Sequence, residues 1–175
     1  CESCEGQFAQ YEGYVARVWY EQNAIPSLVF TDEVVISDLD YPQFKLFHLS
    51  LLWRASVSSI HMYAGIQLGP HQERIGQMLL NQDPGTPEDY GFLANVLVAD
   101  DGHVVHGLLR QPRMSQQARL KTCQFVFGGC AWTYLIEGTR EEIGLGSSSR
   151  PIRIWLCQLG DSTPSASEGY PDASL

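Results

Sequence analysis

The first four residues hold the one pair of side chains in this sequence whose spacing is typical of a metal site. Cys1 and Cys4 are separated by two residues, and two thiolates at that spacing on a tight turn can bind one tetrahedral zinc ion through bonds of about 2.3 Å. The remaining cysteines, Cys123, Cys130 and Cys157, fall in predicted strands and provide no second Cys-x-x-Cys. We therefore expect Cys1 and Cys4 to form half of a structural zinc site whose other two ligands lie upstream of residue 1.

Other interpretations of the two cysteines stay open. They can be incidental, or Cys1 can be the processed nucleophile of an amidohydrolase that uses its own α-amine as the base, or the lipidated first residue of a lipoprotein. A nucleophile at position 1 normally begins a strand, whereas apolar residues at helical spacing start here at Phe8. That early apolar side chain also disfavours the flexible tether that follows a lipidated cysteine.

The histidines do not form a second metal site by their spacing. His103 and His106 are three residues apart on a predicted strand, so their side chains point to opposite faces and cannot readily bind one ion. His48 lies on an apolar helix and is expected to be a core histidine with a hydrogen-bond partner. His61 and His71 lie in or beside a predicted loop, where a binding role is the less favoured alternative.

Arg54 is the unusual charge of the sequence, because it stands on a largely apolar predicted helix within Trp53-Arg54-Ala55-Ser56. Such a side chain needs a carboxylate partner or a route to water. The first expectation is a structural ion pair with Asp38 or Asp40. The alternative is a contact to a phosphate.

The elements that must position these residues are predicted to be helices followed by strands. Apolar residues at intervals of three and four predict helices over 5–22, from an Asp40 cap through Ala55, and from Gly69 or Pro70 to Leu80. Runs rich in β-branched and aromatic residues predict strands within 27–36 and over 92–99, 103–109, 120–127, 130–136 and 152–159. Hairpin turns are expected at residues 100–102 and at Gly128-Gly129. Cys123 and Cys130 on either side of the second turn are expected to be buried free thiols.

These elements predict an α+β fold in which N-terminal helices pack on a mainly antiparallel sheet, with a zinc-knuckle start. We expect three parts. Residues 1–22 would be the second half of a zinc knuckle plus a helix, residues 23–160 an α+β domain, and residues 161–175, rich in Ser, Pro, Asp and Gly, a disordered tail.

Composition restricts the partners of the chain. Its 175 residues are 44% hydrophobic, which suits one globular domain, and 11 Lys and Arg against 20 Asp and Glu give a formal charge of −9. That charge repels phosphates and anionic membrane surfaces. No stretch approaches the roughly 18 apolar residues of a bilayer span. An odd number of cysteines favours a reducing compartment, so the cytoplasm is expected.

Several strings give the chain a family resemblance. Cys1-Glu2-Ser3-Cys4-Glu5, Tyr11-Glu12-Gly13-Tyr14, Phe44-Lys45-Leu46-Phe47 and the run from Leu49 to Ser56 resemble bacterial HNH-endonuclease-like proteins, over roughly residues 1–136. The resemblance implies that Cys1 and Cys4 are zinc ligands of the second of two knuckles. It also implies that the nuclease centre, with a histidine as general base for metal-assisted phosphodiester cleavage, belongs to a segment upstream of residue 1.

The expected function is therefore the non-catalytic C-terminal portion of an HNH-like, zinc-braced DNA nuclease. It would position DNA, through the upstream segment, or a protein partner, with no membrane contact. One alternative is a zinc-braced protein-binding or regulatory module without catalysis, and another is an N-terminal-nucleophile hydrolase that uses Cys1. We assign no catalytic residue within the chain, and no ligand-binding residue besides the zinc ligands Cys1 and Cys4.

Overall fold

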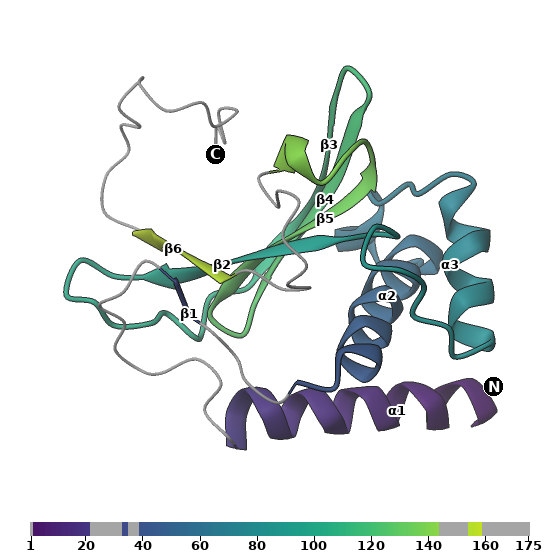
Figure 1. The fold of residues 1–175 in the computed structure, drawn as a ribbon, viewed down its shortest axis with the longest axis horizontal. Helices are drawn as coiled ribbons and strands as arrows, with labels where there is room; N and C mark the ends of the chain where they lie inside the picture. The colour runs from purple at the N-terminus through teal and green to yellow at the C-terminus, as the bar shows by residue number, and fades with distance from the viewer. Residues whose placement is uncertain (1, 22–32, 35–38, 144–153, 159–175) are drawn as a thin grey trace.

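The computed structural model describes residues 2–21, 33–34, 39–143 and 154–158, which form three helices and a six-stranded sheet (Figure 1). The helices are α1 (Glu2–Ala16), α2 (Tyr41–Val57) and α3 (His71–Leu80). The strands are β1 (Glu33–Val34), β2 (Phe92–Val98), β3 (Arg110–Gln117), β4 (Leu120–Phe127), β5 (Cys130–Glu137) and β6 (Ile154–Gln158). The predicted α+β class and the order of helices before the main sheet are confirmed.

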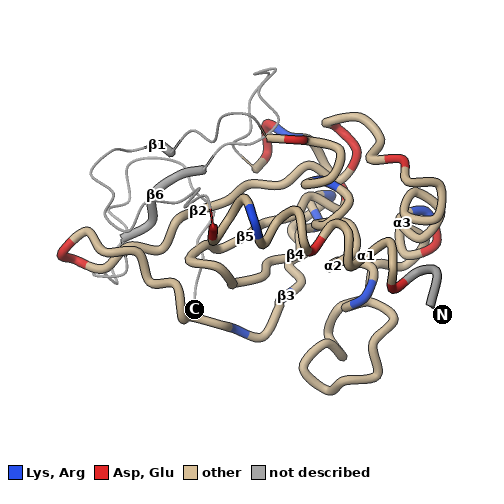
Figure 2. Tube along the Cα trace, turned by 90° about the horizontal axis from the view of Figure 1, so that it is seen from below, with Lys and Arg blue, Asp and Glu red and all other residues tan. Residues whose placement is uncertain are grey.

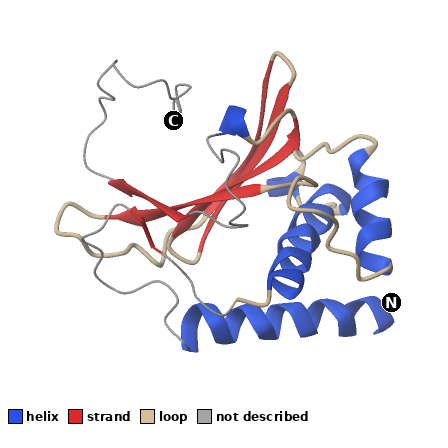
Figure 3. Ribbon diagram, viewed as in Figure 1, coloured by secondary structure: helices blue, strands red, loops and turns tan. Residues whose placement is uncertain are grey.

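The sheet has the strand order β1-β6-β2-β5-β4-β3 and is mainly antiparallel. Among the described strand pairs only β2 and β6 are parallel, and β6 is antiparallel to its other neighbour, β1. The central strand β2 is buried on both faces, which explains its almost continuous apolar sequence, Phe92 to Val98. The helices lie together on one side of the sheet (Figure 3).

Large aromatic side chains join the helices to the sheet. The ring of Trp19 lies 5.1 Å from that of Trp132 on β5. Phe44 on α2 lies 6.1 Å from Trp132 and from Phe92 on β2. Tyr11, Tyr14, Val15 and Val18 of the first helical segment belong to the same buried cluster. The described part of residues 1–22 therefore shares one core with the sheet, and the boundary expected at residues 22 and 23 lies outside the described residues.

The first helical segment begins earlier than expected and changes form near its end. It starts at Glu2 instead of Glu5, and after Ala16 it continues as a π-helical turn from Arg17 to Glu21. A π turn holds one extra residue and changes the direction of the side chains that follow. Here Trp19 enters the core, and its indole N–H donates to the carbonyl oxygen of Gly128 at 2.8 Å.

Helix α2 begins where the sequence predicts. The Asp40 carboxylate accepts the backbone N–H of Gln43 at 3.1 Å, which satisfies one of the free donors of the first turn. The buried positions include Lys45, His48 and Ser50 as well as the apolar residues, so α2 is the central helix of the layer. The third predicted helix is confirmed as α3.

The hairpin between β4 and β5 has the predicted two-residue turn. Gly128 and Gly129 have φ of 61° and 79°, the left-handed conformations of a type I′ turn. A Cβ on Gly128 would lie 2.9 Å from Nε1 of Trp19. Glycine is therefore needed here both for the turn and for the close approach of the indole.

The strand expected over residues 103–109 is wrong. After the turn at 100–102 only an isolated bridge joins Val98 and Val104, and the next strand is β3 at Arg110–Gln117. Strand β3 lies at the edge of the sheet and is mostly exposed. An exposed strand does not need alternating apolar and polar residues, so its sequence lacks the pattern by which strands are predicted. The last expected strand is confirmed as β6.

Of the expected strands within 27–36, only Glu33–Val34 is described, and the expected tail 161–175 lies outside the described residues. No helix in the described ranges has the length and apolar character to cross a bilayer.

Candidate functional site

The cysteine pair is only partly within the described residues. Cys1 lies outside them, and Cys4 lies in the first turn of α1, which begins at Glu2. The helix thus includes the second cysteine, whereas the sequence predicted that it would begin just after it. Within the described residues, no three His, Cys, Asp or Glu side chains lie close enough to hold a metal ion. The zinc half site remains a prediction.

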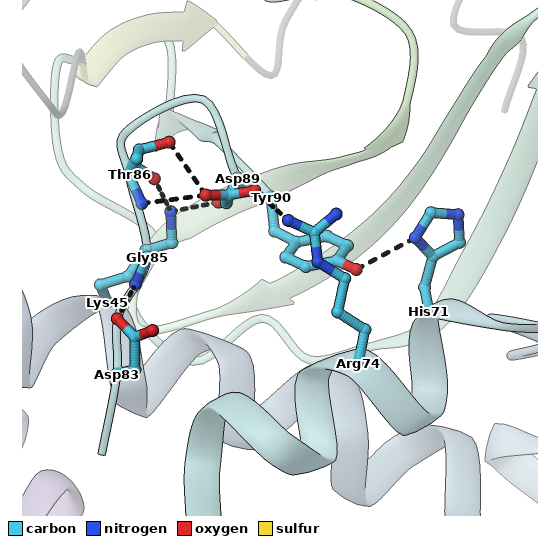
Figure 4. A network of polar contacts seen from close by, with 8 residues as sticks. All are labelled: Lys45, His71, Arg74, Asp83, Gly85, Thr86, Asp89 and Tyr90. Carbon is cyan, nitrogen blue, oxygen red and sulfur yellow. Dashed lines mark hydrogen bonds and ion pairs between the residues drawn. The ribbon is translucent and has the colours of Figure 1, made fainter. Parts of the chain in front are cut away.

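A polar network around the loop from Asp83 to Tyr90 is the main cluster of ionisable groups in the described chain (Figure 4). The loop follows α3 and leads into β2. Hydrogen bonds within the loop run from the backbone N–H of Gly85 to Asp83 at 2.9 Å and from that of Thr86 to Asp89 at 3.0 Å. Side chains from α2 and α3 then fix this loop from both sides.

Lys45 of α2 holds the loop from the inside. It is fully buried, and its Nζ donates to the carbonyl oxygen of Asp89, to that of Thr86 at 3.3 Å and to the Tyr41 hydroxyl at 3.4 Å. Burial lowers the pKa of Lys45 to about 8, because desolvation disfavours the ammonium ion. A lysine of that pKa could act as a base, but its three donors are used and solvent does not reach it. Its role is to clamp the loop.

Asp89 and Arg74 hold the loop from the outside. The Asp89 carboxylate accepts from the backbone N–H and, at 2.9 Å, from the hydroxyl of Thr86, and it forms an ion pair with Arg74 of α3. The pKa of Asp89 is lowered mainly by the hydrogen bond from the Thr86 backbone N–H, and less by the charge of Arg74. Both partners favour the ionised carboxylate.

Tyr90, His71 and Glu137 form a chain of hydrogen bonds at the end of this loop. Nδ1 of His71 lies 3.0 Å from the Tyr90 hydroxyl, and Nε2 lies 3.3 Å from the Glu137 carboxylate. A neutral ring protonated on Nε2 satisfies both partners. The order carboxylate, imidazole, hydroxyl is that of a nucleophilic triad. However, Tyr90 is buried and burial raises its pKa, so its hydroxyl is a poor nucleophile.

His48 is the core histidine that the sequence predicts. It is 1% exposed, and its Nδ1 shares a hydrogen bond of 2.7 Å with the Tyr134 hydroxyl. Its Nε2 is buried with no hydrogen-bond partner. Desolvation, with a smaller contribution from Lys45, holds the pKa of His48 well below its usual value. The ring is therefore neutral and part of the aromatic core.

Arg54 forms the predicted structural ion pair, but with a different partner. Its guanidinium lies 2.6 Å from the Glu12 carboxylate on α1 and over the ring of Phe8. The expected partner Asp40 instead caps α2, at the opposite end of the helix from Arg54, and Asp38 lies outside the described residues. The error arose because the packing of α1 along α2 cannot be read from the local sequence.

The remaining candidates are placed apart from each other. Cys123 and Cys130 are buried free thiols, as predicted, and burial raises the pKa of each to about 12. His103 pairs with Asp101 in its own turn, at 3.2 Å. His61 is exposed in a short 3-10 turn, His61–Tyr63.

Sequence reasoning missed the clamp in which Lys45, Arg74 and His71 hold the loop from Asp83 to Tyr90. A lysine inside the apolar run from Phe44 to Leu46 was the available signal, because a buried ammonium ion requires several acceptors. Two of its three partners, the carbonyl groups of Thr86 and Asp89, could not be identified, since they lie more than forty residues away in the sequence.

An apolar groove of about 260 Å³ lies where α1 and α3 meet the end of α2. Its apolar lining comes from one residue of each of α1 and α2 and from three of α3, namely Phe8, Trp53, Gly76, Leu79 and Leu80. Gln7, Glu73 and Gln77 add polar groups. Gly76 makes room for the indole, because a Cβ there would lie 3.0 Å from Nε1 of Trp53. Concave apolar surfaces of this kind commonly bind ligands or partner side chains.

No protein-family model, no curated protein and no solved structure matches this chain.

Proposed function

We propose that this chain is the non-catalytic C-terminal portion of an HNH-like nuclease, in which zinc holds the amino terminus against an upstream catalytic segment. The observation that carries the proposal is the position of Cys4 in the first turn of α1, within the strings that resemble the HNH-like family. A knuckle that leads directly into a helix suits zinc, because helix N-termini favour negative charge and cysteine binds zinc as the thiolate.

Two buried ionisable side chains, Lys45 and His48, and the half-buried His71 support a non-catalytic role through the bonds they make. Lys45 bonds to loop carbonyls, His48 to a core tyrosine, and His71 to Tyr90 and Glu137. Each of these side chains stabilises the packing of helices and sheet. In this proposal the chain positions DNA or a partner protein, and the upstream segment carries the histidine base.

The test is the zinc content of the protein produced with any residues that precede Cys1 in its gene. We expect one zinc ion per chain, lost in a Cys4→Ser variant and retained in a Cys123→Ala variant, which removes a thiol distant from the knuckle. Equal zinc in Cys4→Ser and in the unmodified protein would refute the proposal. So would a protein without zinc.

A second candidate is a protein-binding module without catalysis, and the apolar groove beside Trp53 favours it. DNA binding separates the two roles. In Figure 2 the Lys and Arg residues drawn in colour are scattered and form no continuous stripe in that view, and the net charge is −9. We expect this chain alone to show no saturable binding to a fluorescent duplex at low salt. Tight binding would contradict the charge argument and place the DNA contact in this chain.

A further inference from the structure

The hairpin of β3 and β4 carries positive charge on an acidic molecule. Four of the 11 Lys and Arg residues of the chain lie within residues 110–121, and this stretch contains no Asp or Glu. The rest of the chain has seven Lys and Arg against 20 Asp and Glu, so the net charge is +4 in this stretch and −13 outside it. We call residues 110–121 the basic hairpin. Its charge attracts an acidic partner.

Two arginines of the basic hairpin are available for such a partner. Arg119 and Lys121 each pair with a glutamate of the chain, at 3.4 and 3.7 Å. Arg110 and Arg113 are exposed on β3, and within the described residues neither forms an ion pair. These two guanidinium groups are therefore the ones that can bind a carboxylate from outside.

A β-bulge brings Arg110 and Arg113 to the same face of the sheet. Residues three apart on a regular strand point to opposite faces. Here the register shifts between the two arginines, and they lie opposite Val126 and Gln124 of β4. Because those two β4 residues are two apart, they share a face and are separated by about 7 Å along the strand. The arginines share that face and have a similar separation.

This face of the sheet is turned away from the helices. Phe125, between the two β4 residues, lies opposite Trp132 of β5. The Trp132 ring lies 6.1 Å from that of Phe44 on α2, so Phe125 is on the helical side and its neighbours on β4 are on the other. The arginines thus face away from the aromatic core.

The outer edge of β3 is open to a further strand. β3 is last in the strand order and pairs with β4 alone. Gln117 and Leu120 flank a two-residue turn and form its bonded pair, so by alternation the backbone groups of Met114 and Gln116 point away from β4. The turn at residues 61–63 lies near β3, but no backbone hydrogen bond joins it to β3 in the described part of the chain.

The same features limit which strands can pair with this edge. Charged residues, a proline and a bulge protect an exposed edge from aggregation, and β3 has all three, since Pro112 lies within the bulge. Arginines repel basic strands and offer nothing to neutral ones. An acidic strand is the one that gains from them.

We infer that β3 binds an extended acidic segment of a partner protein as an added strand, with carboxylates at alternate positions paired with Arg110 and Arg113. Side chains alternate along a strand, so the residue between two such carboxylates faces the helical side. There Met114 packs against the core. The segment recognised is therefore one in which acidic and apolar residues alternate. The inference does not depend on the zinc half site.

The first measurement is the fluorescence anisotropy of a labelled peptide, Thr-Val-Glu-Val-Glu-Val-Thr, titrated with the unmodified chain at low salt. We expect saturable binding with a dissociation constant of about 100 µM, weakened by added salt. A peptide of the same composition with its glutamates adjacent should bind about threefold to fivefold more weakly, because only one carboxylate can face the arginines. No binding, or equal binding of the two peptides, would overturn the inference.

Variants then locate the contact. Arg110→Gln and Arg113→Gln should each raise the dissociation constant about threefold to fivefold. Arg119→Gln is the matched control, because it removes one charge from the same hairpin but from a side chain that pairs with Glu142. It should change binding less than about twofold. Equal losses in all three variants would mean that net charge alone attracts the peptide, which overturns the inference.

Methylation of the peptide backbone tests whether the peptide adds as a strand. Alternate N–H groups of an added strand point toward β3, so N-methylation of one alternate set should abolish binding and N-methylation of the other should preserve it. Equal effects of the two sets contradict strand addition. A single-stranded DNA oligonucleotide should not displace the peptide. Displacement at lower concentrations than the unlabelled peptide requires would make the hairpin a phosphate-binding surface and overturn the inference.

Discussion

At the scale of single residues, the hydrogen bonds and the protonation states of the buried polar side chains affect the stability of the fold. Lys45 is buried as a donor to three oxygen atoms. His48 is buried as a neutral ring against Tyr134. A lowered pKa in the folded state makes stability depend on pH, so these side chains can be tested without any knowledge of a ligand.

His48 predicts a loss of stability in mild acid. Its pKa is held well below 6.5 in the folded chain, whereas in the unfolded chain it binds a proton as pH falls through about 6.5. The unfolded state then binds more protons, so the free energy of unfolding should fall by up to about 1.4 kcal/mol per pH unit from pH 6.5 downward. Urea unfolding between about pH 7 and pH 5 measures this slope.

A His48→Gln variant provides the comparison. Glutamine keeps a group that can bond to the Tyr134 hydroxyl but binds no proton, so this variant should lose the slope over that pH range. His61→Gln, an exposed control, should retain it. An unchanged slope in His48→Gln would mean that another group is responsible.

At the scale of elements, the loop from Asp83 to Tyr90 is held by contacts that cross the fold. Lys45 from α2, Arg74 from α3 and His71 at the start of α3 all reach it. Tyr90 has a positive φ of 52°, a conformation that costs free energy for a bulky residue and persists only when its surroundings enforce it. The clamp supplies that enforcement at the entry to β2.

Removing the charge of Asp89 should loosen this loop. Asp89→Asn loses the ion pair with Arg74 and weakens the carboxylate bonds to Thr86, so we expect a loss of about 1–3 kcal/mol in the free energy of unfolding. Glu88→Gln changes a largely exposed neighbour and should cost much less. Denaturant titration of both variants gives the comparison. Equal effects would show that the clamp does not depend on Asp89.

The elements with strong local signals could be predicted from the sequence, and those defined by distant partners could not. The Asp40 cap and the Gly128-Gly129 turn are local, and both were located correctly. Strand β3 was missed because an exposed edge strand can be polar along its length. The π turn that carries Trp19 was missed because its hydrogen-bond partner, Gly128, lies 109 residues further along the chain.

At the scale of the whole molecule, the described residues form a helical layer on a sheet with one core, and the full sequence has a net charge of −9. Its α+β class followed from helical spacing giving way to strand patterns after Tyr90. The zinc half site expected at Cys1 and Cys4 stays a prediction, because Cys1 lies outside the described residues.

The central claim is that Cys1 and Cys4 bind a metal together with an upstream pair. Replacing zinc with cobalt(II) in the protein that includes any residues before Cys1 tests it most directly, because thiolate-to-cobalt charge transfer reports the ligands and the visible bands report the geometry. We predict tetrahedral bands with thiolate charge transfer that decrease in Cys4→Ser. A spectrum of octahedral cobalt without thiolate charge transfer, or one that Cys4→Ser leaves unchanged, would contradict the account.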